Sequence, residues 1–169
     1  MKPILFTAAA LALSAPAFAQ APAAAKAPTQ TTFYGSPNSN ISSGVAIPAG
    51  KAYVWTSGTT PAPANAQAPA GSRERFGDTK TQAASILRSI GQQLERQGLT
   101  MKDVVYIRAY LVADAAKGNK IDTEGWNAAY NEVFNTAANP TKPARSTVGV
   151  SALVNSDWLI EIEAFAVFP

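Results

Sequence analysis

The chain has 169 residues, contains neither cysteine nor histidine, and carries a formal net charge of +3. No disulfide can therefore support the fold, and a metal site would depend on carboxylates alone, which form no credible ligand cluster in the sequence. The basic residues are scattered along the chain, which argues against a nucleic-acid-binding surface. We expect a protein that binds no metal and has no nucleic-acid partner.

Residues 1–19 have the three parts of a secretory signal peptide. Lys2 supplies the basic start, residues 4–15 are apolar or small, and residues 17–19 match an A-x-A cleavage site. A membrane anchor is the less favoured alternative, because the apolar run is shorter than the roughly 20 residues that a span requires. We expect cleavage near Gln20, a periplasmic or secreted location, and no membrane association of the mature protein.

Residues 20–40 are predicted to be a flexible leader. Ala, Pro, Thr and Gln dominate this stretch, and it has no apolar periodicity with which to bury surface. Residues 41–169 are long enough for one domain with one hydrophobic core.

The first predicted strand of any length covers residues 52–56, which are rich in aromatic and β-branched side chains and run into a turn at Ser57-Gly58. A weaker strand at 45–47 precedes it, and we expect the two to form an opening hairpin. The proline-rich segment 60–72 is predicted to be a long loop.

An amphipathic helix is predicted from Thr79, where a capping box with Gln82 fits, to the neighbourhood of Gly98, which suits a left-handed C-terminal cap. Its apolar side chains recur at intervals of three and four residues; they are Ala83, Ile86, Leu87, Ile90 and Leu94.

Residues 103–113 then alternate between apolar and other side chains, as a strand with one buried face does. The predicted core face carries Val105, Ile107, Ala109 and Leu111. A second helix is expected to begin at Asp122 or Thr123 and to end before Asn139-Pro140.

Two final strands are predicted at 146–153 and 159–168, joined as a hairpin through the turn at 155–157. The order of elements predicts an α+β domain in which two helices cover one face of a mixed sheet. The second face also carries apolar groups, among them Tyr106 and Tyr110, so we expect the chain to self-associate.

Arg145 and Glu161 are the strongest candidates for chemistry, because the predicted hairpin places them on neighbouring strands. An arginine holds a planar carboxylate through two parallel hydrogen bonds, and a carboxylate positions a water or moves a proton. The pair therefore suggests a small carboxylic acid as ligand. The alternatives are a surface ion pair for Arg145 and a solvated or cross-strand charge for Glu161; for Glu163, on the same side of its strand, we favour the structural role.

The run PARSTVGVSAL followed by WLIEIEAFAV resembles the C-terminal signature of the Rid family, the reactive-intermediate deaminases also called the YjgF/YER057c/UK114 family. The similarity continues upstream through Leu99–Leu111, Gln82, Phe76-Gly77-Asp78 and Thr56-Ser57-Gly58, so it covers about Ile41 to Pro169. It implies a chorismate-mutase-like, Rid-type α+β domain that assembles as a homotrimer with ligand clefts between subunits.

The same resemblance implies a role for each candidate residue. Arg145 would clamp the carboxylate of an imino or enamino acid, and Glu161 would orient the attacking water or relay a proton. Thr147 stands where many members have a cysteine beside the ligand, and its hydroxyl keeps the polarity. Ser57 and Gly58 would contact the ligand, with a plain turn as the equal alternative.

The implied reaction is the hydrolysis of 2-imino and 2-enamino acids, such as 2-aminoacrylate and its imine, to 2-oxo acids and ammonia. It requires positioning and electrostatics but no cofactor. The alternative is a non-catalytic exported trimer that binds small carboxylates or a protein partner. Ribonuclease activity, a label also attached to this family, has little support from a chain without histidine or a clustered basic groove.

Overall fold

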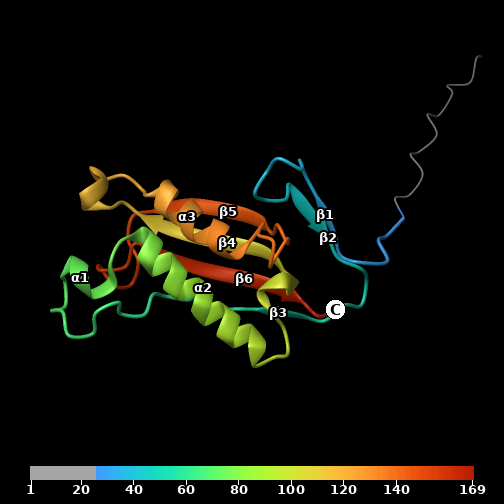
Figure 1. Ribbon diagram of the computed structural model, residues 1–169, viewed down its shortest axis with the longest axis horizontal. Coiled ribbons are helices and arrows are strands. Elements are labelled where there is room, and N and C mark those ends of the chain that lie inside the picture. The colour runs from blue at the N-terminus through green and yellow to red at the C-terminus, as the bar shows by residue number, and fades with distance from the viewer. Residues whose placement is uncertain (1–25) are drawn as a thin grey trace, which may run out of the picture.

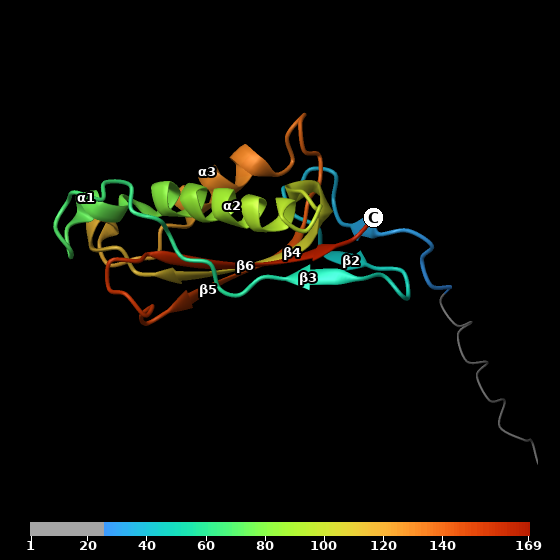
Figure 2. The same cartoon turned by 90° about the horizontal axis from the view of Figure 1, so that it is seen from below.

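The computed structural model describes residues 26–169, in which one mixed sheet carries both long helices on the same face (Figure 1 and Figure 2). The predicted signal peptide lies outside the described residues. In the part of the chain that is described, no helix is both long and apolar enough to cross a membrane. The architecture confirms the predicted α+β class.

The main sheet has four strands in the order β3-β6-β4-β5. Strands β4 and β5 run parallel, with α3 in the connection between them, and β6 lies antiparallel to both β4 and β3. Their bounds are Tyr53–Trp55 for β3, Ile160–Val167 for β6, Val104–Val112 for β4 and Ala144–Val150 for β5. The helices are α1 (Arg73–Phe76), α2 (Thr79–Glu95) and α3 (Thr123–Val133), and short 3-10 turns occupy Met101–Asp103 and Ala115–Lys117.

The predicted hairpin between the last two strands is wrong. Although β5 and β6 follow each other in the chain, β6 inserts between β3 and β4, so that β4 separates the two last strands. Central strand β6 is buried on its helix-facing side along its whole length, with Ile160, Ile162 and Ala164 at most 1% exposed. A central position covers that apolar side better than an edge would.

The core lies between the sheet and helices α2 and α3 (Figure 2). The predicted alternation in β4 is confirmed for Ile107, Ala109 and Leu111, which are buried in the core. At the start of the strand the pairing register shifts, so that Val104 joins the core cluster in place of the predicted Val105. The predicted stripe of α2 is likewise buried, and Trp126, Tyr130 and Phe134 from α3 and its end fill the space beside it. These apolar contacts fix which face of the sheet the helices cover.

Helix α2 begins one residue earlier than the predicted capping box. Asp78 is the N-cap, and its carboxylate accepts a hydrogen bond from the Thr81 amide at 2.8 Å. Gln82 instead reaches across to the start of β6, where its Oε1 accepts from the Leu159 amide at 2.8 Å. Gly98 adopts φ +74° just after the helix, as the left-handed cap required.

The N-terminal strands pair differently from the prediction. β1 (Thr32–Tyr34) forms a separate two-stranded sheet with β2 (Gly44–Ala46), and β3 pairs with β6 instead of with β2. Residues 32–34 had been assigned to the flexible leader, so the leader's predicted boundary is wrong at this end. Strands this short carry too few alternating apolar residues for the sequence to indicate which strand they pair with.

Candidate functional site

Arg145 lies on the face of β5 that α3 covers, and three side chains of that helix hold it. Its guanidinium carbon stands 4.6 Å from the ring centroid of Tyr130 and 5.4 Å from that of Trp126. Its Nη2 donates a hydrogen bond to Asn127 Oδ1 at 2.8 Å. Two cation–π contacts and one hydrogen bond therefore keep the planar fork in one orientation.

The surroundings of Arg145 leave its charge uncompensated. No carboxylate lies within 4 Å of its guanidinium among residues 26–169. Partial burial lowers the pKa of Arg145, and burial also raises the pKa of Tyr130 to about 12, so that this phenol is neutral at pH 7. A half-buried cation without an acidic neighbour can accept an external anion as its partner.

Thr147 lies two residues after Arg145 on the same face of β5. The indole Nε1 of Trp126 donates a hydrogen bond to Thr147 Oγ1 at 3.1 Å, and the Trp126 ring is fully buried. One indole thus contacts both predicted ligand-binding side chains of β5. The structure brings Arg145 and Thr147 together, as the sequence had suggested.

Ser57 and Gly58 lie beside β6, at an irregularity in its pairing with the end of β3. Thr56 pairs with Ala164 through backbone hydrogen bonding and Thr59 pairs with Ile162, so two residues stand opposite one on β6. This two-against-one arrangement is that of a β-bulge, a feature that re-aims side chains. The predicted turn at Ser57-Gly58 is therefore a bulge in a continuing strand.

Glu161 points to the face of the sheet that the helices leave open, and its carboxylate lies directly against Gly58. A β-carbon added to Gly58 would collide with that carboxylate. Among residues 26–169, the Glu161 carboxylate makes no hydrogen bond within the chain and no ion pair. It is half-buried, and its proton-accepting oxygens remain available to a ligand or a water.

Glu163 lies on the same open face but is engaged. Its Oε2 accepts a hydrogen bond from Tyr110 Oη at 3.4 Å and pairs with Arg108 Nη1 at 3.7 Å. Hydrogen bonds to Tyr110 and Tyr106 raise the pKa of Arg108, which stays charged. The structure thus gives the second glutamate of the pair the structural role that we favoured.

The candidate residues form two half-sites on opposite faces of one sheet. Arg145 and Thr147 lie on the helix side of β5, whereas Glu161, with Ser57 and Gly58 beside it, lies on the open side of β6. Strand β4 separates the two strands. The expectation that Arg145 and Glu161 lie on neighbouring strands is therefore wrong, and within one chain no small ligand reaches both.

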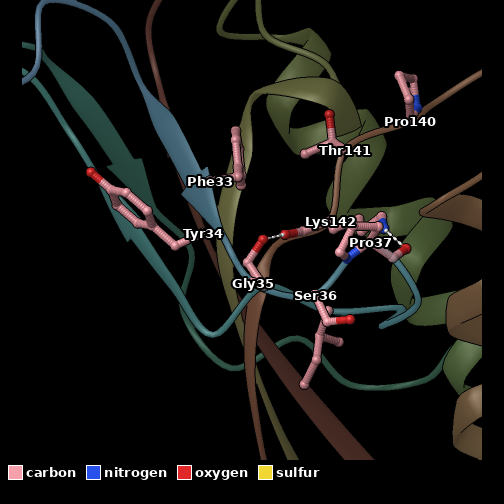
Figure 3. A pocket seen from close by; sticks show the side chains of 10 residues that line it. Phe33, Tyr34, Gly35, Ser36, Pro37, Pro140, Thr141 and Lys142 are labelled. Carbon is pink, nitrogen blue, oxygen red and sulfur yellow. Dashed lines mark hydrogen bonds between the residues drawn. The ribbon is translucent and has the colours of Figure 1, made fainter.

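A pocket of about 340 Å³ lies elsewhere, between the β1–β2 hairpin and residues 140–142 (Figure 3). Phe33 and Tyr34 form part of its wall, and Lys142 reaches across to donate a hydrogen bond to the Pro37 carbonyl at 2.8 Å. Neither half-site lines this pocket. Its lysine is already used to tie the hairpin loop to the start of β5.

The contacts between side chains of α3 and Arg145 were not predicted from the sequence. Trp126, Asn127 and Tyr130 all lie in the second predicted helix, for which the sequence indicated no contact with Arg145. The available signal was their spacing: Trp126 and Asn127 stand four and three residues before Tyr130, which places each of them beside Tyr130 on the helix surface, and the helix immediately precedes the Arg145 strand. Only the parallel pairing of β4 with β5 places that helix over Arg145.

Residues 40–168 match the family model described as endoribonuclease L-PSP. The RutC family protein PH0854 of Pyrococcus horikoshii is 39% identical over 92 residues, which cover 53% of this chain and 63% of that protein. The chain therefore spans less than two thirds of that curated relative.

Two solved structures share the fold. YyfB of Yersinia pestis, described as a protein of unknown function of the conserved Rid family, has a TM-score of 0.57 and 25% identity, covering 82% of this chain and 99% of its own. The structure of E. coli TdcF with bound serine has a TM-score of 0.54 and 27% identity, covering 73% of this chain and 85% of its own.

Proposed function

The chain belongs to the Rid family, and from this membership together with its two half-sites we propose that it hydrolyses 2-imino and 2-enamino acids to 2-oxo acids and ammonia. Representative substrates are 2-aminoacrylate and its imine tautomer. The general assignment to the family rests on the comparisons, while the reaction is our proposal.

The observation that carries the proposal is the state of Arg145. Its guanidinium is held in one orientation by Tyr130, Trp126 and Asn127, yet no carboxylate of the described residues neutralises it. A fork held in this way is suited to bind a carboxylate of a ligand through two hydrogen bonds. The relative TdcF was solved with serine, an amino acid with a carboxylate, which is consistent with such a ligand.

We further propose that a neighbouring subunit completes the site. Arg145 and Glu161 lie on opposite faces of one sheet, so a ligand that touches both requires the Arg145 half-site of one subunit and the Glu161 half-site of the next. The open face offers an apolar contact surface: Tyr53 and Trp55 are each 61% exposed, and Phe165 stacks on Tyr53 at 4.7 Å. A homotrimer with three such clefts would bring the two half-sites together and would cover the exposed apolar side chains of the open face.

The chemistry follows from these positions. With the substrate carboxylate on Arg145, a water held by Glu161 attacks the C=N carbon, and Glu161 passes the proton to the nitrogen that leaves as ammonia. The net change adds one water to the imine and releases one ammonia and one 2-oxo acid. Thr147, Ser57 and the backbone at Gly58 supply the remaining polar contacts, and the residues need no metal or organic cofactor for this step.

The test is turnover of freshly generated 2-aminoacrylate, measured as pyruvate and ammonia release. We expect Arg145→Ala to raise KM by about 10–100-fold through loss of a charge-assisted hydrogen bond. Glu161→Gln should lower kcat by about 100-fold or more, as loss of a general acid–base does. Glu163→Gln is the matched control and should stay near wild type, because Glu163 contacts Arg108 and Tyr110.

No turnover by the wild type would refute the deaminase proposal for this substrate. If small carboxylates still bound in an Arg145-dependent manner, the protein would be a non-catalytic carboxylate-binding trimer instead. Ribonuclease activity that persisted in both Arg145→Ala and Glu161→Gln would point to a contaminant. We also propose export of the protein, on the strength of residues 1–19; N-terminal sequencing of protein from the periplasmic fraction tests this.

A further inference from the structure

The hydrogen bond between Trp126 and Thr147 determines what Thr147 offers to a ligand. The indole N–H is a donor only, so the 3.1 Å contact fixes Thr147 Oγ1 as the acceptor. A threonine hydroxyl has one proton and two acceptor sites, and this contact occupies one of the acceptor sites. The hydroxyl proton therefore has to point away from Trp126.

No acceptor inside the chain takes that proton. Among the described residues, the Thr147 hydroxyl donates no hydrogen bond, and Thr147 is exposed. Trp126 itself is 0% exposed and packs edge-on against Tyr130, with ring centroids 5.6 Å apart, so its N–H is held in place by the core. The contact with Trp126 thus excludes one direction for the Thr147 proton before any ligand arrives.

Thr147 lies close to Arg145 on β5. The two residues are separated by two positions on one face of β5, which places their Cα atoms roughly 7 Å apart. Trp126 contacts both side chains. The centroid of its ring lies 5.4 Å from the guanidinium carbon of Arg145, and its Nε1 lies 3.1 Å from Thr147 Oγ1. A small acid whose carboxylate binds Arg145 would therefore extend toward Thr147 with the atom next to its carboxylate.

We infer that Trp126 is a positioning residue that turns the Thr147 hydroxyl proton away from the core and leaves it to donate to a ligand, and that this donor selects acids with an oxygen or nitrogen acceptor at position 2. The inference rests on the proposed function and narrows it. Neutral 2-imino acids and 2-oxo acids present such an acceptor, whereas simple alkyl carboxylates do not. An apolar acid of the same size would leave the Thr147 proton without a partner in the complex.

The test compares pyruvate with propanoate, two acids of similar size that are both ionised at pH 7.5, by calorimetric titration of the assembled wild-type protein. We expect pyruvate to bind about fivefold more tightly, the value of one hydrogen bond. Thr147→Val, a change of similar shape at an exposed position, should abolish this preference because it removes the hydroxyl donor. Thr147→Ser should retain it.

Trp126→Phe tests the positioning role itself. It keeps an aromatic ring in the core but removes the N–H, so the Thr147 hydroxyl can rotate, and the preference for pyruvate should fall to about twofold. Because the buried substitution could affect folding, each titration is paired with a thermal unfolding curve, and Ser146→Ala on the opposite face of β5 serves as the control. The ratio of the two affinities is unaffected by a general loss of folded protein.

The outcomes separate the two proposals. Equal binding of pyruvate and propanoate, lost in Arg145→Ala, would overturn the role of Trp126 and Thr147 while leaving the carboxylate site intact. A pyruvate preference that survives in Thr147→Val would also overturn it. Binding of neither acid would contradict the carboxylate site as well.

Discussion

Mixing two inactive variants tests whether the site is shared between subunits. Arg145→Ala removes only the helix-side half-site, and Glu161→Ala removes only the open-side half-site, because the two residues lie on opposite faces of the sheet with β4 between their strands. At a substrate concentration well below the wild-type KM, Glu161→Ala alone should have below about 1% of wild-type activity and Arg145→Ala about 1–10%. In an assembly of both, a cleft between an Arg145→Ala subunit and a Glu161→Ala subunit can contain the two intact residues together.

The expected recovery follows from counting. If each cleft takes its arginine from one subunit and its glutamate from the next, equal random mixing makes each residue intact with probability one half. About one quarter of the clefts then regain both residues, whatever the number of subunits in a closed ring. If one chain supplied both residues to the same cleft, no cleft would recover.

The assay is 2-aminoacrylate turnover after co-expression of the two variants with different affinity tags. Mass spectrometry of the intact assemblies establishes the fraction of mixed species. Tandem purification removes the unmixed ones, which raises the expected fraction of complete clefts in a trimer from about one quarter to about one third. Verified mixed assemblies that stay at the level of the parent variants would refute the shared site. A mixture of Glu161→Ala with Glu163→Ala serves as the control. All of its subunits keep Arg145 and the Glu163→Ala subunits keep Glu161, so a cleft in this mixture needs only an intact Glu161. Its activity therefore gives the upper limit for the activity of a mixed assembly.

Two further substitutions follow from individual contacts. Gly58→Ala should lower kcat by about 100-fold, because a β-carbon at this position displaces the Glu161 carboxylate. Gly44→Ala is the control and should leave kcat unchanged, since a β-carbon at Gly44 meets no atom within 4 Å. Equal activity of the two variants would contradict the placement of Glu161. Arg73→Met should cost about 1–3 kcal/mol at pH 7, since Arg73 is 44% exposed but bonds the buried Asp114 bidentately. The hydrogen bond from Arg73 holds the pKa of Asp114 below its usual value, so this stabilisation is present above about pH 4 and is lost as the pH falls through the folded pKa. Urea unfolding at pH 7 and pH 3 measures it, and an equal difference at both values would contradict the ion pair.

The sequence by itself determined the elements that periodicity marks. The α2 stripe and the alternation of β4 were correct because burial of one face imposes a period of 3.6 or 2 on the chain itself. The ordered motifs around Arg145 and Glu161 also pointed to the family, which the match of residues 40–168 to the family model confirms. These features depend on positions a few residues apart in the chain.

Tertiary structure alone decided how the strands pair and therefore where the site residues lie. The predicted β5–β6 hairpin failed because the small entropic advantage of pairing adjacent strands is outweighed by burying the helix-facing side of β6 at the centre of the sheet. The insertion puts β4 between the two strands, and the registers with β4 place Arg145 and Glu161 on opposite faces. The β4–α3–β5 crossover brings Trp126, Asn127 and Tyr130 over Arg145. Side chains from distant segments meet only after these pairings are made, so local sequence patterns could not reveal the half-sites.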